Sequence, residues 1–290
     1  MSASTDFKRL LAAEAQARAA ERDEPEEAEG EIDEDWQGAQ AEPYVVETGT
    51  TKSLHFSFTA TQSRMNLRHP EHLSLAYTRT MMGFLLFMPA PAAVAMIGLG
   101  GGSLARFIHR HLPEASMKVV EINPSVIDLR TEFQVPDDGE RFKVRLGDGA
   151  AFVQDPPRRY DVLLVDGFDV QGQPPELASL DFYLDCRSTL EPDGVLVVNL
   201  FPGFAGFERQ VENLGIAFAG QLLLVRDREC HSCVAFAART PLAQLFQAEV
   251  LARSPLADQA AWEHLWPSLK RIARQFRLAQ RDAISGSRGS

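Results

Sequence analysis

The sequence predicts an α/β protein built on a doubly wound, mostly parallel seven-stranded sheet. From residue 93 onward, short apolar strand patterns alternate with helical ones, which is the order of an open sheet covered on both faces. Glycine-rich or acidic loops follow four of these strands, at the strand ends where such sheets bind ligands. A small β segment and an acidic tail precede this region.

The first 43 residues predict a disordered tail. Residues 1–47 contain 14 acidic and four basic side chains, a net charge of −10 in a chain whose total is −11. A segment this polar buries too little apolar surface to fold alone, although a short helix at 6–21 is compatible with its pattern. Because the rest of the chain is almost neutral, the acidity says little about the partners of the folded part.

Residues 44–72 predict a small N-terminal β segment. The stretch "SLHFSFTAT" alternates apolar and polar side chains, as a half-buried strand does. The chain then turns through "RHPEH" into a helix that contains Tyr77.

An uncharged run of 25 residues, Met81 to Ala105, is long enough to suggest a membrane span. Pro89 and Pro91 interrupt it, and four glycines end it with the poorest helix formers after proline. We therefore expect a helix at about 73–87, a buried parallel strand at 93–97 and a glycine loop.

The remaining elements follow in regular order through the main domain at 73–240, and C-terminal helices and a tail follow at 241–290. A turn is expected at "EPDG", and one of the last two strands is expected to pair antiparallel at the sheet edge. The other expected strands are 117–121, 142–146, 161–165, 195–200, 221–226 and 232–238. The helices are expected near 103–111, 124–133, 179–190 and 206–219, with a short one after Gly147-Asp148-Gly149.

Composition excludes several classes of protein. The basic C-terminal positions have the spacing of one solvated helix face, so no nucleic-acid surface is predicted. They are Lys270, Arg271, Arg274, Arg277 and Arg281. Cys230 and Cys233 lack a second ligand pair, which predicts buried strand cysteines and no metal site. The N-terminus has no basic start followed by an apolar core, so a cytoplasmic location is expected.

The four loops carry the candidate binding residues. Gly98, Gly100, Gly101 and Gly102 form the first loop, whose backbone could approach a ligand at a helix N-terminus. Glu121 follows the second strand, where an acid can accept both hydroxyls of a ribose. Taken alone, the glycines could simply form a turn and Glu121 could cap a helix.

The third and fourth loops are "GDG" and "DGFD". Asp148, next to Gly149, could accept the exocyclic amine of adenine or cap a helix, and Asp166 could be a solvated loop acid. Because all four features fall at successive strand ends, together they predict a nucleoside site.

Residues 44–240 resemble the spermidine synthase family, the polyamine aminopropyltransferases, which have the fold of class I S-adenosylmethionine methyltransferases. The motifs that carry the resemblance are "IGLGGGSL", "VVEINP", "GDGAAF", "YDVLLVDGFD" and "LEPDGVLVVNL". A branch of protein methyltransferases shares the "GLGGGSL…VEI" motif, so the motifs alone do not determine which reaction is catalysed.

The resemblance implies a role for each candidate. Glu121 would hold the ribose, Asp148 the adenine, and Asp166 would be the base that deprotonates an attacking amine. Asp169 would bind the amine chain and Tyr77 would orient it. The implied donor is decarboxylated S-adenosylmethionine or S-adenosylmethionine, without a metal. The implied partner is a small amine such as putrescine, with no nucleic acid or membrane, and a homodimer is left open.

The chain departs from the family pattern at three places. Gly101 replaces a loop aspartate that would pair with the donor ammonium, a charge-assisted bond of roughly 1.5–3 kcal/mol. Thr78-Arg79 replaces Gln-Glu, and Val170 replaces a proline. The loss at position 101 favours intact S-adenosylmethionine, whereas the acids and Tyr77 favour an amine acceptor.

We therefore expect aminopropyl transfer to an amine. The alternatives are a methyltransferase, a non-catalytic nucleoside- or polyamine-binding homologue and, last, a nicotinamide enzyme.

Overall fold

The computed structural model describes residues 42–56, 61–168, 172–226 and 232–286. Residues 41–278 cluster as one compact unit, and the account below concerns that unit. The expected helix at 6–21, Asp169, Val170 and the first cysteine of the C-x-x-C pair lie outside the described residues, as does the predicted disordered tail up to residue 41.

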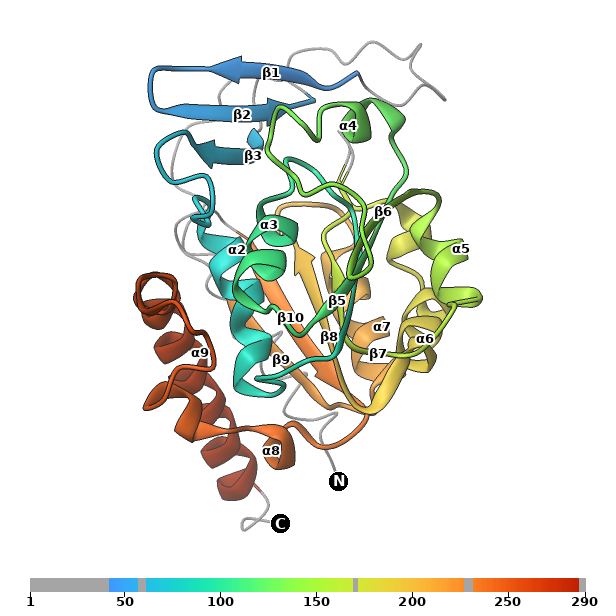
Figure 1. Cartoon of the computed structure of the whole chain (residues 1–290). Coiled ribbons are helices and arrows are strands. Elements are labelled where there is room, and N and C mark those ends of the chain that lie inside the picture. The colour runs from blue at the N-terminus through green and yellow to red at the C-terminus, as the bar shows by residue number, and fades with distance from the viewer. Residues whose placement is uncertain (1–41, 57–60, 169–171, 227–231, 287–290) are drawn as a thin grey trace, which may run out of the picture. The chain divides into compact units, whose positions relative to one another are not determined.

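The N-terminal β segment is an antiparallel sheet in the order β1-β2-β3, drawn in blue in Figure 1. Its strands are β1 (Tyr44–Glu47), β2 (Thr51–His55) and β3 (Thr61–Asn66). Leu54 and Met65 point inward and join the main hydrophobic core. The prediction of a small β segment is confirmed, and its last strand lies where it can contact the glycine loop.

The main sheet has seven strands in the order β6-β5-β4-β7-β8-β10-β9. The strands are β4 (Ala93–Ile97), β5 (Ser116–Glu121), β6 (Phe142–Leu146), β7 (Tyr160–Val165), β8 (Leu190–Leu200), β9 (Leu222–Arg226) and β10 (Cys233–Ala238). β10 is the one strand of this sheet that points opposite to the other six, so the predicted mostly parallel sheet is confirmed.

The expected antiparallel pairing at the sheet edge is confirmed, because the edge strand β9 pairs antiparallel with β10. β10 lies between β8 and β9, and β9 forms the edge. The connection from Arg226 to Cys233 is too short for a crossover helix, so β10 must turn back beside β9.

The expected turn at residues 191–194 is an excursion within β8. Leu190 pairs with Tyr160, and the next pair is Val195 with Val162, so β8 carries three more residues than β7 over this interval. The turn residues are extruded from the ladder, and β8 continues on both sides of them.

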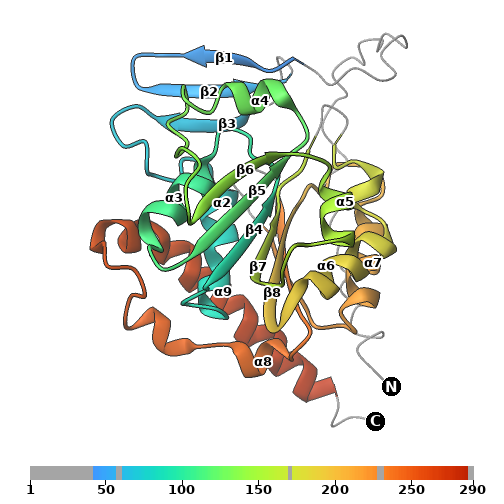
Figure 2. The same cartoon turned by 45° about the vertical axis from the view of Figure 1, so that its right-hand side comes forward.

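Helices cover both faces of the main sheet, as Figures 1 and 2 show from two directions. On one side lie α2 (Ala76–Met81), the 3₁₀ helix η1 (Met82–Leu86), α3 (Ser103–His111) and α9 (Gln259–Gly286). On the other lie α5 (Gly149–Gln154), α6 (Leu180–Thr189) and α7 (Phe207–Ala217). The short elements are α4 (Pro124–Asp128), η2 (Pro175–Leu177), α8 (Leu242–Leu245) and η3 (Ala248–Leu251).

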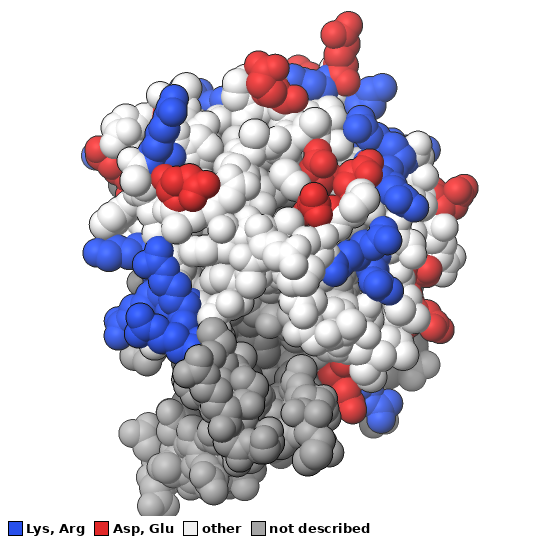
Figure 3. All heavy atoms as spheres, turned by 90° about the horizontal axis from the view of Figure 1, so that it is seen from below, with Lys and Arg blue, Asp and Glu red and all other residues white. Residues whose placement is uncertain are grey.

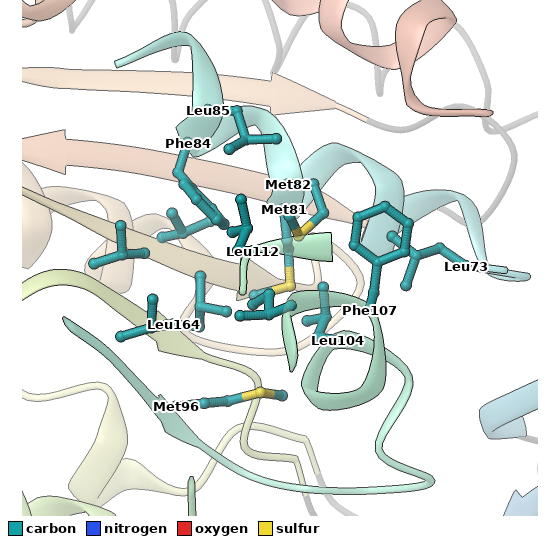
Figure 4. Packing of buried hydrophobic residues seen from close by; sticks show 14 of the residues in the cluster. Leu73, Met81, Met82, Phe84, Leu85, Met96, Leu104, Phe107, Leu112 and Leu164 are labelled. Carbon is teal, nitrogen blue, oxygen red and sulfur yellow. The ribbon is translucent and has the colours of Figure 1, made fainter. Parts of the chain in front are cut away.

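Two helices are shorter than expected. The helix expected at 73–87 begins at Ala76 and tightens into η1 at Met82, and the one expected at 124–133 ends at Asp128. Much of the uncharged run belongs to the hydrophobic core. Figure 4 shows Met81 and Phe84 in the same packed cluster as Leu164 of β7. Within the described part of the chain, no helix is both long and apolar enough to cross a membrane.

The basic positions of α9 do not form one solvated face. Lys270, Arg274 and Arg277 are exposed, and Figure 3 shows basic side chains gathered at the left edge of the view from below, on the side where α9 lies. Arg271 instead turns inward and donates from Nη2 to the buried Thr80 Oγ1 at 2.6 Å. Arg271 therefore links α9 to α2, which corrects the expectation for that residue.

Candidate active site

The glycine loop joins β4 to α3 at the carboxyl edge of the sheet. Gly98, Gly100 and Gly102 have φ angles of 88°, 51° and 66°, a region that other residues rarely adopt. A Cβ at Gly98 would overlap the carbonyl oxygen of Asp166 and lie 2.8 Å from its carbonyl carbon. Glycine at this position therefore lets the loops after β4 and β7 meet backbone to backbone.

Glu121 ends β5 beside this loop and is only 7% exposed. Its Oε2 accepts the Leu99 N–H at 2.7 Å, and its Oε1 accepts the Asn123 N–H at 2.9 Å. The helix that follows is capped by Asn123, which accepts the Ser125 N–H at 2.9 Å. Glu121 is therefore not a helix cap, and its carboxylate ties the glycine loop to the loop after β5.

Asp148 follows β6 and is the N-cap of α5. Its Oδ1 accepts the Ala150 N–H at 2.7 Å, while its Oδ2 makes no hydrogen bond within the described residues. A Cβ at Gly149 would overlap the side chain of Ile97, so α5 starts against β4 only because residue 149 is glycine. Capping of α5 thus uses one carboxylate oxygen of Asp148 and leaves the other available to a ligand.

Two exposed apolar side chains near Glu121 and Asp148 escaped the sequence analysis. Ile122 is 55% exposed and Leu146 is 60% exposed, and Leu146 pairs with Glu121 across the β5–β6 ladder. Each is an isolated apolar residue next to a polar one, a pattern too common to single out from sequence. Both lie at the carboxyl end of the β5–β6 ladder, where they expose apolar surface.

The structure brings Tyr77 and Asp166 together from positions 89 residues apart. The Tyr77 hydroxyl donates to Asp166 Oδ2 at 3.2 Å, and Asn199 Nδ2 donates to Asp166 Oδ1 at 2.9 Å. Asn199 was missed by sequence reasoning, although it is the one polar side chain in the apolar stretch "VLVVNL". It is 7% exposed, and its Oδ1 has no hydrogen-bond partner among the described residues.

Burial raises the pKa of the Asp166 carboxyl above its ordinary value. The hydrogen bonds from Asn199 and Tyr77 lower that pKa, and the charge of Glu121 raises it. The net effect is a carboxylate held in place by two neutral donors, with a greater affinity for a proton than an exposed aspartate has. A carboxylate whose pKa lies nearer the working pH is a better proton acceptor than an exposed aspartate.

The departures from the family motif have structural counterparts. A Cβ at Gly101 would lie 2.6 Å from Ser63 Oγ and 3.0 Å from Phe133 Cδ1, so β3 occupies the space that an aspartate would need. Arg79 donates from Nη1 to the Leu73 and Ser74 carbonyl oxygens at 2.8 and 3.2 Å. The Arg79 side chain therefore holds the backbone of the segment that precedes α2.

A family model, the spermine/spermidine synthase domain, matches residues 74–200. The polyamine aminopropyltransferase of Neisseria meningitidis serogroup B is 42% identical over 193 residues, which cover 66% of this chain and 73% of the relative. The chain belongs to the polyamine aminopropyltransferase family. The resemblance inferred from the motifs is thus confirmed.

Other matches extend the comparison. A crystal structure of a probable spermidine synthase from Corynebacterium glutamicum superposes with a TM-score of 0.59 at 18% identity, covering 77% of this chain and 90% of that one. This likeness confirms the predicted fold. The bovine eEF1A lysine and N-terminal methyltransferase is 33% identical over 158 residues, 50% of this chain and 22% of that protein.

Replacing Glu121 with glutamine is expected to weaken binding of methylthioadenosine at least tenfold, about 1.4 kcal/mol. Glutamine keeps one acceptor oxygen and places N–H groups where the carboxylate serves the loop and, in our assignment, the ribose. Asp148→Asn is expected to have a similar effect while preserving the helix cap, because asparagine caps as well as aspartate. Isothermal titration calorimetry measures both, and unchanged affinity in both variants would refute the nucleoside assignment.

Proposed function

We propose that this protein transfers an aminopropyl group from decarboxylated S-adenosylmethionine to a small amine. The observation that carries the proposal is the Asp166 carboxylate, held by Tyr77 and Asn199 at the carboxyl edge of the sheet. Membership of a family named for this reaction supports it.

In the proposed reaction, Asp166 accepts a proton from the ammonium group of the acceptor. The free amine then attacks the carbon bound to the sulfonium sulfur, so that a carbon–nitrogen bond forms and the carbon–sulfur bond breaks. The electron pair of the broken carbon–sulfur bond remains on sulfur, and methylthioadenosine is the leaving group. Asn199 Oδ1, buried without a partner among the described residues, would accept a second N–H of the amine.

The nucleoside part of the donor is proposed to lie across the ends of β4, β5 and β6. Glu121 would accept the ribose hydroxyls, Asp148 Oδ2 the adenine amine, and Ile122 with Leu146 would contact the faces of the ring. The backbone of Gly98–Gly102 would lie along the part of the donor that carries the sulfonium group. Tyr77 is proposed to orient the acceptor, and Asp169 keeps its predicted role in holding the amine chain.

Methyl transfer is the second candidate, and one observation favours it. Gly101 carries no carboxylate for the donor ammonium, and β3 fills the space beside it. On the other side, an intact methionine carboxylate would approach an edge that already carries Glu121 and Asp166. Repulsion between like charges therefore favours the decarboxylated donor.

Calorimetric titration of the whole chain with both donors tests this choice. We expect decarboxylated S-adenosylmethionine to bind at least tenfold more tightly than S-adenosylmethionine, with methylthioadenosine as the control ligand for the nucleoside pocket. If S-adenosylmethionine binds tighter while methylthioadenosine binds normally, the donor assignment is wrong and methyl transfer becomes the better interpretation.

A further inference from the structure

The turn that leads into α2 carries two imidazoles and a carboxylate that the proposed reaction does not use. Glu71 Oε1 lies 3.7 Å from His69 Nδ1 and 3.9 Å from His72 Nε2. The three ligand atoms all lie within 4.8 Å of one another. The three atoms thus form a triangle, and the carboxylate oxygen is beyond hydrogen-bond distance of either ring nitrogen.

The backbone of this turn is held from several directions. Asn66 Oδ1 accepts the N–H groups of Arg68 and His69 at 2.9 and 3.2 Å. The His72 N–H closes the turn on the His69 carbonyl oxygen at 3.0 Å, with Pro70 at the second position, where proline suits a β-turn.

A side chain of α3 also holds the turn. Arg106, a buried residue of α3, donates from Nε to the Pro70 carbonyl oxygen at 3.1 Å. The same arginine donates from Nη1 to the carbonyl oxygens of Gly101, at 2.6 Å, and Phe133. The two imidazoles and the carboxylate therefore project from a pre-formed loop that shares its anchor with the glycine loop.

A third histidine completes a column of rings. His72 stacks on His69 and on His264 of α9, with centroid separations of 4.8 Å in each case. His264 Nε2 donates to the Leu73 carbonyl oxygen at 3.1 Å, which ties this ring to the segment that follows the turn.

We propose that His69, Glu71 and His72 bind a divalent transition metal ion such as Zn²⁺. Two imidazoles and one carboxylate are ligands that zinc accepts, with a fourth position for water. Zinc–nitrogen distances of about 2.0–2.1 Å in a tetrahedron imply ligand separations of about 3.4 Å. The two separations from Glu71 Oε1, 3.7 and 3.9 Å, therefore need to close by about 0.5 Å or less, and no pair of ligand atoms needs to close by more than about 1.4 Å. The ion would fix the segment five residues ahead of Tyr77.

One side chain has to turn for this geometry. The rings of His69 and His72 are inclined by only 14°, whereas a metal ion lies in the plane of each imidazole that binds it. The side chain of His69 is 57% exposed, so its ring can rotate without disturbing the core. The other two ligands lie on the same anchored turn.

Calorimetric titration of the metal-stripped whole chain with ZnCl₂ tests the site. We expect one Zn²⁺ per chain with a dissociation constant on the order of micromolar or lower. His69→Ala and Glu71→Gln are each expected to weaken binding at least tenfold. His109→Ala is the matched control, because His109 is a partly buried histidine of α3 outside the site, and it should bind as the parent does.

The result that overturns the proposal is the absence of saturable binding, or stoichiometric binding that survives His69→Ala and Glu71→Gln. The second outcome would assign the ion to other residues. His69 is exposed and Glu71→Gln preserves size, so both variants are expected to fold, which circular dichroism checks. Neither variant touches the proposed catalytic residues, so the test is independent of the proposed function.

Discussion

Replacing Asp166 with asparagine is expected to lower amine transfer by roughly 10²–10⁴ while donor affinity changes little. Asparagine keeps the shape of the side chain and one acceptor oxygen, but it cannot take a proton from the acceptor ammonium. The loss should appear in kcat, because the donor is held mainly by groups at the ends of other strands. Steady-state kinetics with calorimetry of donor binding separate the two effects. Full turnover in this variant would mean that the carboxylate is structural.

The pH dependence of kcat tests the role of Asp166 independently of the asparagine variant. In the proposed mechanism the active form of Asp166 is the carboxylate, so activity should fall as pH falls through its pKa, which burial raises above the ordinary value. Tyr77→Phe removes a hydrogen bond that lowers this pKa, so the acid limb of kcat should move to higher pH. A limb at unchanged pH would show that Tyr77 does not act through Asp166.

Replacing Gly98 with alanine is expected to lower the free energy of unfolding by at least about 3 kcal/mol and to abolish nucleoside binding. The φ of 88° is unfavourable for alanine, and the new Cβ would overlap the Asp166 carbonyl oxygen. That atom belongs to the backbone, so no side-chain rotation relieves the clash. Urea unfolding followed by circular dichroism measures the loss.

Gly206→Ala is the control for backbone strain alone. Gly206 has a φ of 93°, yet a Cβ there would meet nothing within 4 Å. We expect it to cost only about 1 kcal/mol. Equal losses in the two variants would mean that the β4 and β7 loops do not need the close approach.

The sequence predicted the strands and the polar residues at their ends because both signals are local. Apolar runs and a glycine or an acid after each run are visible in one dimension. The pairing of Tyr77 with Asp166 came only from the resemblance, and the structure supplies its hydrogen bond.

The features that sequence missed depend on which neighbours a side chain meets. Asn199 is an ordinary polar residue until β8 lies beside β7. Arg271 fits a solvated stripe until α9 packs on α2, and the reason for Gly101 is visible only once β3 lies beside the loop.

Product analysis tests the central claim most directly. The whole chain is incubated with decarboxylated S-adenosylmethionine and putrescine, and the products are identified by mass spectrometry. The account predicts equal amounts of methylthioadenosine and an aminopropylated amine, both lost in Asp166→Asn. No methylthioadenosine from the decarboxylated donor with any diamine, together with S-adenosylhomocysteine formed from S-adenosylmethionine, would contradict it.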